Sequence, residues 1–331
     1  MNEPLPIGIN IDGVLDHDGL PDPGVAERFA RVAASGAFDY IEKNLVPGED
    51  FAPYRDAVQR HGVPLGVLGG IFCAGRDEAR MHAALGLAGE LGAALFNCQL
   101  FARHADGHAL SDDEVADWCS DALEHGARAG CLPSFEVHVD MWNEDCRRVD
   151  ALAERLARRG LPMRVTLDHA HILYKIGNAQ ELAVAGIADA VARGELVLEP
   201  RSPRAVYTRW LHAGWVVHAH TRSVAPGGPA NAWARRGDGR PGRAIQYPFV
   251  RPQPGAWHSP WRAGALAMWK EAVEQLLAWR AAHPDRAPQR ISCEFIPFAD
   301  CGGGARYPIF EQNLACAAWL RERWSATPGI A

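Results

Sequence analysis

Acidic and histidine side chains stand at the ends of several apolar runs in this chain of 331 residues. They are Glu42, Glu136, His138, Asp168, His169, His171, His218, His220 and Glu294. Burying a carboxylate in such a run without a partner is costly. Carboxylates that are brought together also repel one another, and a bound cation relieves that repulsion. The pattern therefore predicts a site for a divalent ion, and its oxygen and imidazole ligands suit Mn²⁺, Mg²⁺, Co²⁺ or Zn²⁺.

Eight short apolar runs must position these residues. The runs cover 7–11, 38–42, 65–69, 94–98, 133–137, 163–167, 215–219 and 291–295. Between them, amphipathic patterns that often end at Gly predict helices, the clearest at 23–36, 76–92, 111–130, 147–160 and 259–283. Strands that alternate with helices form parallel sheets, and closure of the sheet removes its edges. We therefore expect an α/β protein with a (β/α)₈ TIM barrel as a single domain over 1–331, with an open doubly wound sheet as the alternative.

One long segment, 221–258, interrupts this alternation after the seventh run. It is rich in Gly, Pro and Arg, and it contains the aromatic residues Trp233, Tyr247, Phe249 and Trp257. Loops that follow barrel strands lie at the catalytic face, and a loop of this length is usually functional or disordered. The segment is interpreted as a lid over the site, with a surface excursion or an oligomer contact as an equal alternative.

The bulk composition argues against nucleic-acid and membrane partners. The formal net charge is −6, whereas a nucleic-acid binder usually carries a basic face. No apolar stretch is long enough to span a bilayer, and the N-terminus lacks the pattern of a signal peptide. The 8 cysteines include no CxxC pair, which favours reduced, buried thiols and a cytoplasmic location.

In their order and spacing, the strand-end motifs resemble the xylose isomerase-like superfamily of sugar isomerases, epimerases and endonuclease IV-type barrels. The residues that carry the resemblance are FEVH with Glu136, LDHAH with Asp168 and His171, HAH with His220, and CEF with Glu294. The set spans nearly the whole chain and is closest to ketose 3-epimerase-type members. The resemblance implies that Glu136, Asp168, His220 and Glu294 hold one divalent metal ion.

The same resemblance implies roles in catalysis and in substrate binding. Glu136 and Glu294 would exchange a proton with the substrate through an enediolate intermediate, and His171 would contact substrate oxygens. In the family an arginine often lies beyond the strand-seven histidine. The residue six positions after this histidine is Pro226, so Arg222 is the nearest candidate.

Four further residues are pocket candidates from their positions. His138 is interpreted either as an additional acid or base or as an orienter of a ligand. Asn97 and Glu42 are assigned to substrate binding, although structural packing is the stronger interpretation for both, as it is for Trp142.

The leading function is a metal-dependent isomerase or epimerase that acts on a small sugar or sugar derivative. The alternative is a lyase of the same barrel, such as a sugar dehydratase or an enzyme that cleaves C-glycosides. An abasic-site endonuclease would need three zinc ions and extra histidines on strands three and four, where this chain has Gly69, Gly70, Asn97 and Gln99. A non-catalytic sugar-binding barrel would lack a ligand, yet all four positions are filled, and homo-oligomerisation stays open.

Overall fold

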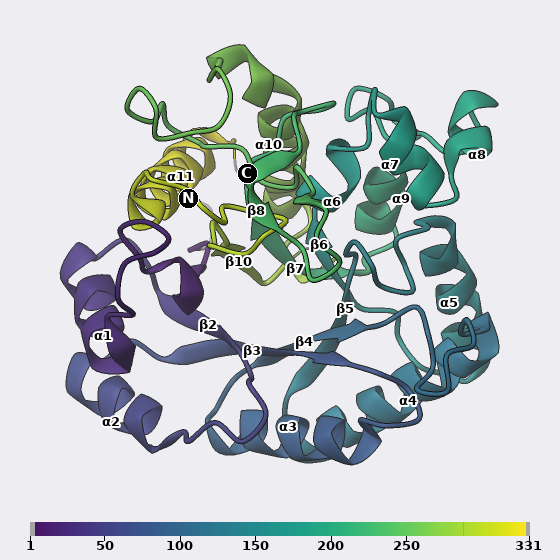
Figure 1. Ribbon diagram of the computed structural model, residues 1–331. Helices are drawn as coiled ribbons and strands as arrows, with labels where there is room; N and C mark the ends of the chain where they lie inside the picture. Colours follow the sequence, from purple (N-terminus) through teal and green to yellow (C-terminus); the bar gives the residue numbers. More distant parts are fainter. Residues whose placement is uncertain (1–3, 287, 329–331) are drawn as a thin grey trace.

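Eight parallel strands close into a barrel, and helices surround it (Figure 1). The computed structural model describes residues 4–286 and 288–328. The strands follow the order β1-β10-β7-β6-β5-β4-β3-β2 around the barrel. They are β1 (Ile7–Asn10), β2 (Tyr40–Asn44), β3 (Leu65–Phe72), β4 (Leu95–Leu100), β5 (Leu132–Glu136), β6 (Val165–Asp168), β7 (Val216–Thr221) and β10 (Arg290–Cys293). Each predicted apolar run overlaps one barrel strand, so the predicted TIM barrel is confirmed.

Helices cover the outer face of the barrel. They are α1 (Gly24–Ser35), α2 (Ala52–His61), α3 (Glu78–Glu90), α4 (Asp112–Ala129), α5 (Arg147–Arg158), α6 (Ala170–Leu173), α7 (Ala179–Val184), α8 (Ala188–Ala192), α9 (Val206–His212), α10 (Ala267–Ala282) and α11 (Ile309–Ala326). Ser111 and Glu114 form a reciprocal capping box at the start of α4. In the described part of the chain, no helix is long and apolar enough to cross a membrane, and all eight cysteines are unpaired and buried.

The predicted helix over 259–283 begins later than expected, at Ala267. The residues before it are tied to the long segment that follows β7. Trp261 Nε1 donates to the carbonyl oxygen of Pro248, and the backbone amide of Arg262 donates to Tyr247 Oη, at 2.8 and 2.7 Å. These tertiary hydrogen bonds hold the backbone outside the helical path, because Arg262 takes an extended conformation with φ −136° and ψ 123°.

Tyr40 closes the barrel interior beneath the polar strand ends. Its ring packs so closely on β1 and β3 that a Cβ at Gly8 or Gly66 would lie 2.2 or 2.7 Å from it. Tyr40 also clusters with Val67 and Leu95, and its hydroxyl lies 2.9 Å from Ser292 Oγ. Because this layer is filled, the site above it faces the C-terminal end of the barrel.

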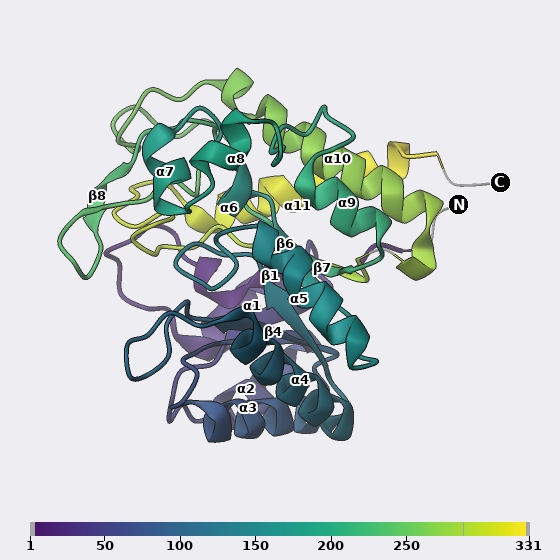
Figure 2. The same ribbon diagram turned by 90° about the vertical axis from the view of Figure 1, so that its right-hand side faces the viewer.

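The segment after β7 is an ordered structure with a two-stranded sheet of its own. Strands β8 (Asn231–Arg235) and β9 (Pro241–Gly242) pair in antiparallel fashion. The buried Asn231 amide donates to three carbonyl oxygens in the loop after β10, those of Ala299, Cys301 and Gly303. Figure 2 shows β8 at one end of the molecule, beyond the barrel strands. The contacts with the loop after β10 place the hairpin at the C-terminal end of the barrel.

Arg243 anchors this segment to the barrel. The side chain is 6% exposed and pairs with Glu144 and Glu181, and its Nη2 lies 2.5 Å from Tyr174 Oη. Burial would raise the pKa of Glu144, but the hydrogen bond from Arg243 and the charge of Lys175 lower it below its ordinary value. The carboxylates therefore depend on the guanidinium for their charge balance.

We predict that Arg243→Ala destabilises the protein and releases the hairpin. Removing one partner of a buried ion pair leaves the other charges uncompensated and costs about 3–5 kcal/mol of the free energy of unfolding. Urea denaturation measures the stability, and limited proteolysis at 221–258 measures the release. Arg240→Ala is the matched control, since Arg240 is 68% exposed and pairs only locally with Asp238. Equal stability of the two variants would contradict the anchoring role.

Candidate metal centre

Three carboxylates and one imidazole from neighbouring strands meet at the C-terminal end of the barrel. They are Glu136 at the end of β5, Asp168 at the end of β6, His220 on β7 and Glu294 directly after β10. One ligand atom of each lies within 4.8 Å of those of the others. Across the β6–β7 ladder, Asp168 stands directly opposite His220. The structure therefore brings together the four residues that the sequence predicted as ligands.

The charges within this cluster call for a cation. All four residues are at most 3% exposed. Burial raises the pKa of Asp168 to about 7, against the opposing charge of Arg222 and with the like charge of Glu294. Glu294 Oε2 is buried and lies 3.1 Å from His220 Nδ1 and 3.3 Å from Arg222 Nη1. A divalent ion would neutralise the carboxylates and take their oxygens and the imidazole nitrogen as ligands, so the donor set fits one.

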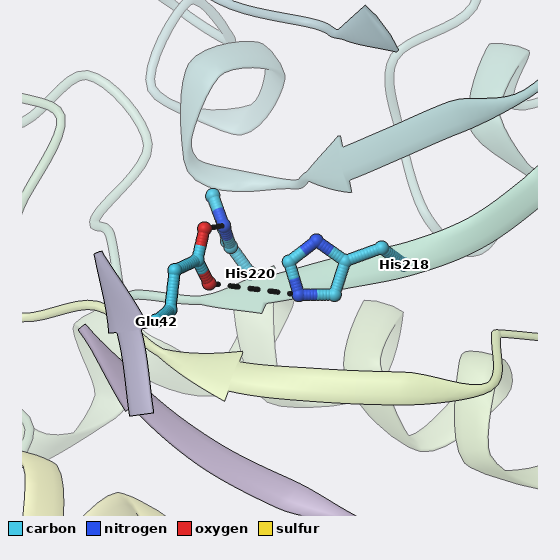
Figure 3. Close-up of side chains that lie close together, drawn as sticks. All are labelled: Glu42, His218 and His220. Atoms are coloured by element: carbon cyan, nitrogen blue, oxygen red, sulfur yellow. Dashed lines mark hydrogen bonds and ion pairs between the residues drawn. The ribbon is translucent and has the colours of Figure 1, made fainter. Parts of the chain in front are cut away.

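His220 is held so that one ring nitrogen faces the carboxylates. Its Nδ1 lies 3.2 Å from Glu136 Oε1 and 3.1 Å from Glu294 Oε2. Its Nε2 lies 2.9 Å from Glu42 Oε1 (Figure 3). If Nε2 donates to Glu42, Nδ1 is left with the lone pair that a metal requires.

Glu42 lies behind His220, with 0% of its surface exposed. Figure 3 shows its carboxylate reaching from β2 toward both histidines of β7, and its second oxygen lies 3.6 Å from His218 Nε2. Glu42 does not line the cavity above the cluster, so its contact with a substrate stays a prediction. We infer from these distances that Glu42 positions the imidazole of His220.

His218 belongs to the barrel interior. Its Nε2 lies 3.0 Å from Ser292 Oγ, and burial lowers its pKa to about 4. It shares a strand face with His220, but it lies one layer deeper and outside the four-residue cluster. This geometry agrees with the prediction of His220, and not His218, as the metal ligand.

Amide side chains hold the outer oxygens of the two glutamates. Asn97 Nδ2 donates to Glu136 Oε2 at 2.5 Å, and Gln99 Nε2 donates to the same oxygen. Asn10 Nδ2 donates to Glu294 Oε1 at 3.1 Å. Asn97 is buried against Glu136, so the structure places it beside a predicted ligand, and its contact with a substrate stays a prediction.

Asn10 and Gln99 were not among the predicted site residues. Both follow the rule that found the ligands, because each is a polar residue near the end of an apolar strand. A buried amide is a weaker indication of a functional site than a buried carboxylate or imidazole, since burying an uncharged group is less costly.

Arg222 lies in the centre of the site, two residues after His220. Its guanidinium pairs with Asp168 Oδ2, and its Nη1 lies 3.3 Å from Glu294 Oε2 and 3.2 Å from Cys301 Sγ. Burial would lower the pKa of Arg222, but Cys301 and the two carboxylates raise it, so the group stays charged. This position suits the predicted contact with an anionic or hydroxyl oxygen of a substrate.

The two histidines beyond β5 and β6 pack together beside Arg222. The rings of His138 and His171 have centroids 3.9 Å apart, and His171 Nε2 lies 2.7 Å from Arg222 Nη2. His171 Nδ1 accepts a hydrogen bond from the backbone amide of Val139 at 3.3 Å. Trp142 is buried in the hydrophobic core, which agrees with its interpretation as a packing residue.

A cavity of about 380 Å³ opens above these residues. Its lining includes Gln99, His138, Arg222 and Glu294 from the site. The long segment contributes Arg235, Arg236, Gly237 and Ile245 to the same cavity. The segment that was interpreted as a lid therefore forms part of the wall over the site, and its closure over a substrate stays a prediction.

Comparisons with known proteins show the same barrel. No family model matches the chain, and no curated protein matches its sequence. The structure is similar to D-allulose 3-epimerase from Methylomonas sp., with a TM-score of 0.56 and 15% identity over 98% of this chain and 100% of that one. It is also similar to a xylose isomerase-like TIM barrel protein from Mycobacterium smegmatis in complex with magnesium, with a TM-score of 0.51 and 12% identity over 97% of each chain.

An AP endonuclease of family 2 from Brucella melitensis is similar as well, with a TM-score of 0.52 and 11% identity over 97% of this chain and 99% of that one. Identities this low show the fold alone. The comparisons therefore show that the chain shares the closed (β/α)₈ barrel of these proteins.

We predict that His220→Asn loses the metal ion and that His218→Asn keeps it. Of these two histidines, which are both buried on β7, His220 is the one with a ring nitrogen in the carboxylate cluster. Metal content after dialysis and Mn²⁺ titration by calorimetry check this, at a temperature where circular dichroism shows all forms folded. The assignment fails if the two variants retain equal amounts of metal.

Glu42→Gln should weaken metal affinity about 10–100-fold, because changing the partner of a metal-bound histidine disturbs its tautomer and orientation. The same Mn²⁺ titration measures this. Glu49→Gln is a control on the following loop, where Glu49 contacts Lys43 at 3.2 Å and Tyr54. Unchanged affinity in Glu42→Gln would show that His220 needs no support from this carboxylate.

Proposed function

We propose that this protein is a divalent-metal-dependent sugar isomerase or epimerase. The observation that carries the proposal is the convergence of Glu136, Asp168, His220 and Glu294 beneath a cavity, with two glutamates in the set. The barrel shared with a ketose 3-epimerase, which is also known in complex with D-allulose, supports a sugar ligand. Mn²⁺, Mg²⁺, Co²⁺ and Zn²⁺ all suit the ligand types, and a cytoplasmic location stays a prediction.

The reaction that suits these residues is the removal and return of a proton on a carbon next to a carbonyl group. Glu294 lines the cavity and is placed to take or give this proton. Glu136, held by Asn97 and Gln99, is the partner carboxylate on the other side of the cluster. A bound divalent ion would supply Lewis-acid stabilisation to the oxyanion of an enediolate intermediate.

Positively charged and imidazole groups would orient the sugar. Arg222 and His138 line the cavity, and His171 lies directly behind Arg222. Their N–H groups suit hydroxyl and carbonyl oxygens, which fix the reacting carbon near Glu294.

A lyase is the alternative function, because loss of a leaving group after the same proton removal needs the same residues. The endonuclease function is less well supported. The ends of β3 and β4 provide Gly69, Gly70, Asn97 and Gln99 in place of histidines, and the net charge is −6. These features argue against a three-metal site and against phosphate binding.

Glu294→Gln should abolish exchange of a substrate carbon-bound proton with solvent. The amide cannot carry the proton, and loss of a positioned acid or base costs about 10²–10⁴-fold in rate. Incorporation of solvent deuterium into a panel of ketoses, with Mn²⁺-loaded protein and NMR detection, measures the exchange.

Glu199→Gln serves as the control, since Glu199 is exposed on the loop between α8 and α9. Wild-type exchange in Glu294→Gln would contradict the assignment. Loss of a substituent without return of the proton, seen as a new product in the same spectra, would replace the isomerase with the lyase.

A further inference from the structure

The cavity over the metal centre has two chemically different parts. Gln99, His138, Arg222 and Glu294 form a polar floor. Farther out, Ile71 at the end of β3 and Phe298 in the loop after β10 line the same cavity. Although both are large and apolar, 43% and 49% of their surfaces remain exposed. Apolar side chains exposed inside a cavity mark a place where a ligand gains by covering them.

A cation that forms no ion pair with the described residues lines the same cavity as these apolar side chains. Arg235 on β8 lines the cavity and donates one long hydrogen bond, at 3.4 Å, to the carbonyl oxygen of Gly239. Among the residues that the structure describes, no carboxylate forms an ion pair with it. Its neighbour Arg236 differs, because Asp140 and Asp300 lie 2.8 and 3.8 Å from its guanidinium. Arg235 is therefore free to pair with a charge on the ligand.

A free monosaccharide matches only the floor. It carries hydroxyl groups on most of its carbons, so it has little apolar surface to place on Phe298 and Ile71 and no anion for Arg235. The volume of about 380 Å³ lies within the range of about 300–1,000 Å³ that is typical of cavities for larger organic ligands.

We propose that the outer part of this cavity is a subsite for an aromatic substituent that carries an acidic group. The inference rests on the proposed function in one respect, since the sugar portion of the ligand is taken to sit on the floor beside Glu294. Phe298 and Ile71 receive the aromatic ring, and Arg235 pairs with the carboxylate or another anion on it. The substrate class is thus an aryl-substituted sugar and not a free ketose.

Binding to the full-length, Mn²⁺-loaded protein tests the subsite without requiring turnover. The probes are matched sets of a hexose, its phenyl glycoside and its 4-carboxyphenyl glycoside, over several hexoses, with calorimetric detection. We expect at least one set in which the phenyl glycoside binds about tenfold more tightly than the hexose, since burying an aromatic ring is strongly favourable. The carboxylate should increase the affinity further. Equal affinity of aryl and free sugars in every set would overturn the inference.

Two pairs of variants locate the effect. Phe298→Ala should reduce the affinity ratio of phenyl glycoside to hexose toward one, whereas Leu132→Ala should keep it. Leu132 is a matched control because it is 42% exposed at the start of β5, at the opposite end of the barrel. Arg235→Gln should remove the preference for the carboxylate, and Arg240→Gln should not. A ratio that is the same in Phe298→Ala and Leu132→Ala would overturn the subsite.

The deuterium-exchange assay separates this inference from the proposed function. Tight aryl binding that depends on Phe298, with no exchange in any probe, would support the subsite and contradict the isomerase. Exchange with free ketoses, together with an affinity ratio of one, would support the isomerase and overturn the subsite.

Discussion

Three carboxylates and an imidazole lie close together inside the barrel, where bulk water is excluded. Most other features of the site offset the electrostatic repulsion among these carboxylates. Like charges a few ångströms apart repel far more strongly in a protein interior than in water. The cluster of Glu136, Asp168, His220 and Glu294 therefore persists only with positive charge in its midst. Arg222 supplies part of this charge from one side. The donor set on the other side suits a divalent ion, so the electrostatic demand of the fold coincides with the chemical requirement of the proposed reaction.

The groups behind the cluster determine how its members can act. Neutral amides hold the outer oxygens of Glu136 and Glu294, so these carboxylates are oriented without a second positive charge that would compete with a metal ion. Glu42 does the corresponding work for His220. A carboxylate behind a metal-binding imidazole both selects its tautomer and increases its basicity. The barrel register makes this arrangement possible, because it places β2 and β7 at heights where their side chains meet across the interior.

The segment after β7 is anchored to the rest of the protein and also forms part of the cavity wall. Its hairpin is held to the loop after β10 by Asn231 and to the helical side of the barrel by Arg243, and it places Arg235 and Arg236 in the cavity wall. The residues that enclose the cavity are thus anchored by buried polar contacts outside it. Arg243 and Glu181, which anchor the segment, are not among the residues that line the cavity above the cluster.

The sequence by itself predicted the eight strands and the barrel, because strand periodicity is a local property. Polar residues at the strand ends indicated a metal site, and the resemblance to a known family selected four of them as ligands. Tertiary structure alone decided what each polar residue faces. Glu42 and Asn97 contact predicted ligands, and so do Asn10 and Gln99, which were not among the predicted site residues. These contacts depend on the closure and the register of the barrel, which set the direction of each side chain. The chemical contrast between the floor and the rim of the cavity likewise arises only when residues from β3, β8 and the loop after β10 come together. No local sequence pattern predicts this arrangement, because the cavity is lined by residues more than 200 positions apart, such as Ile71 and Phe298.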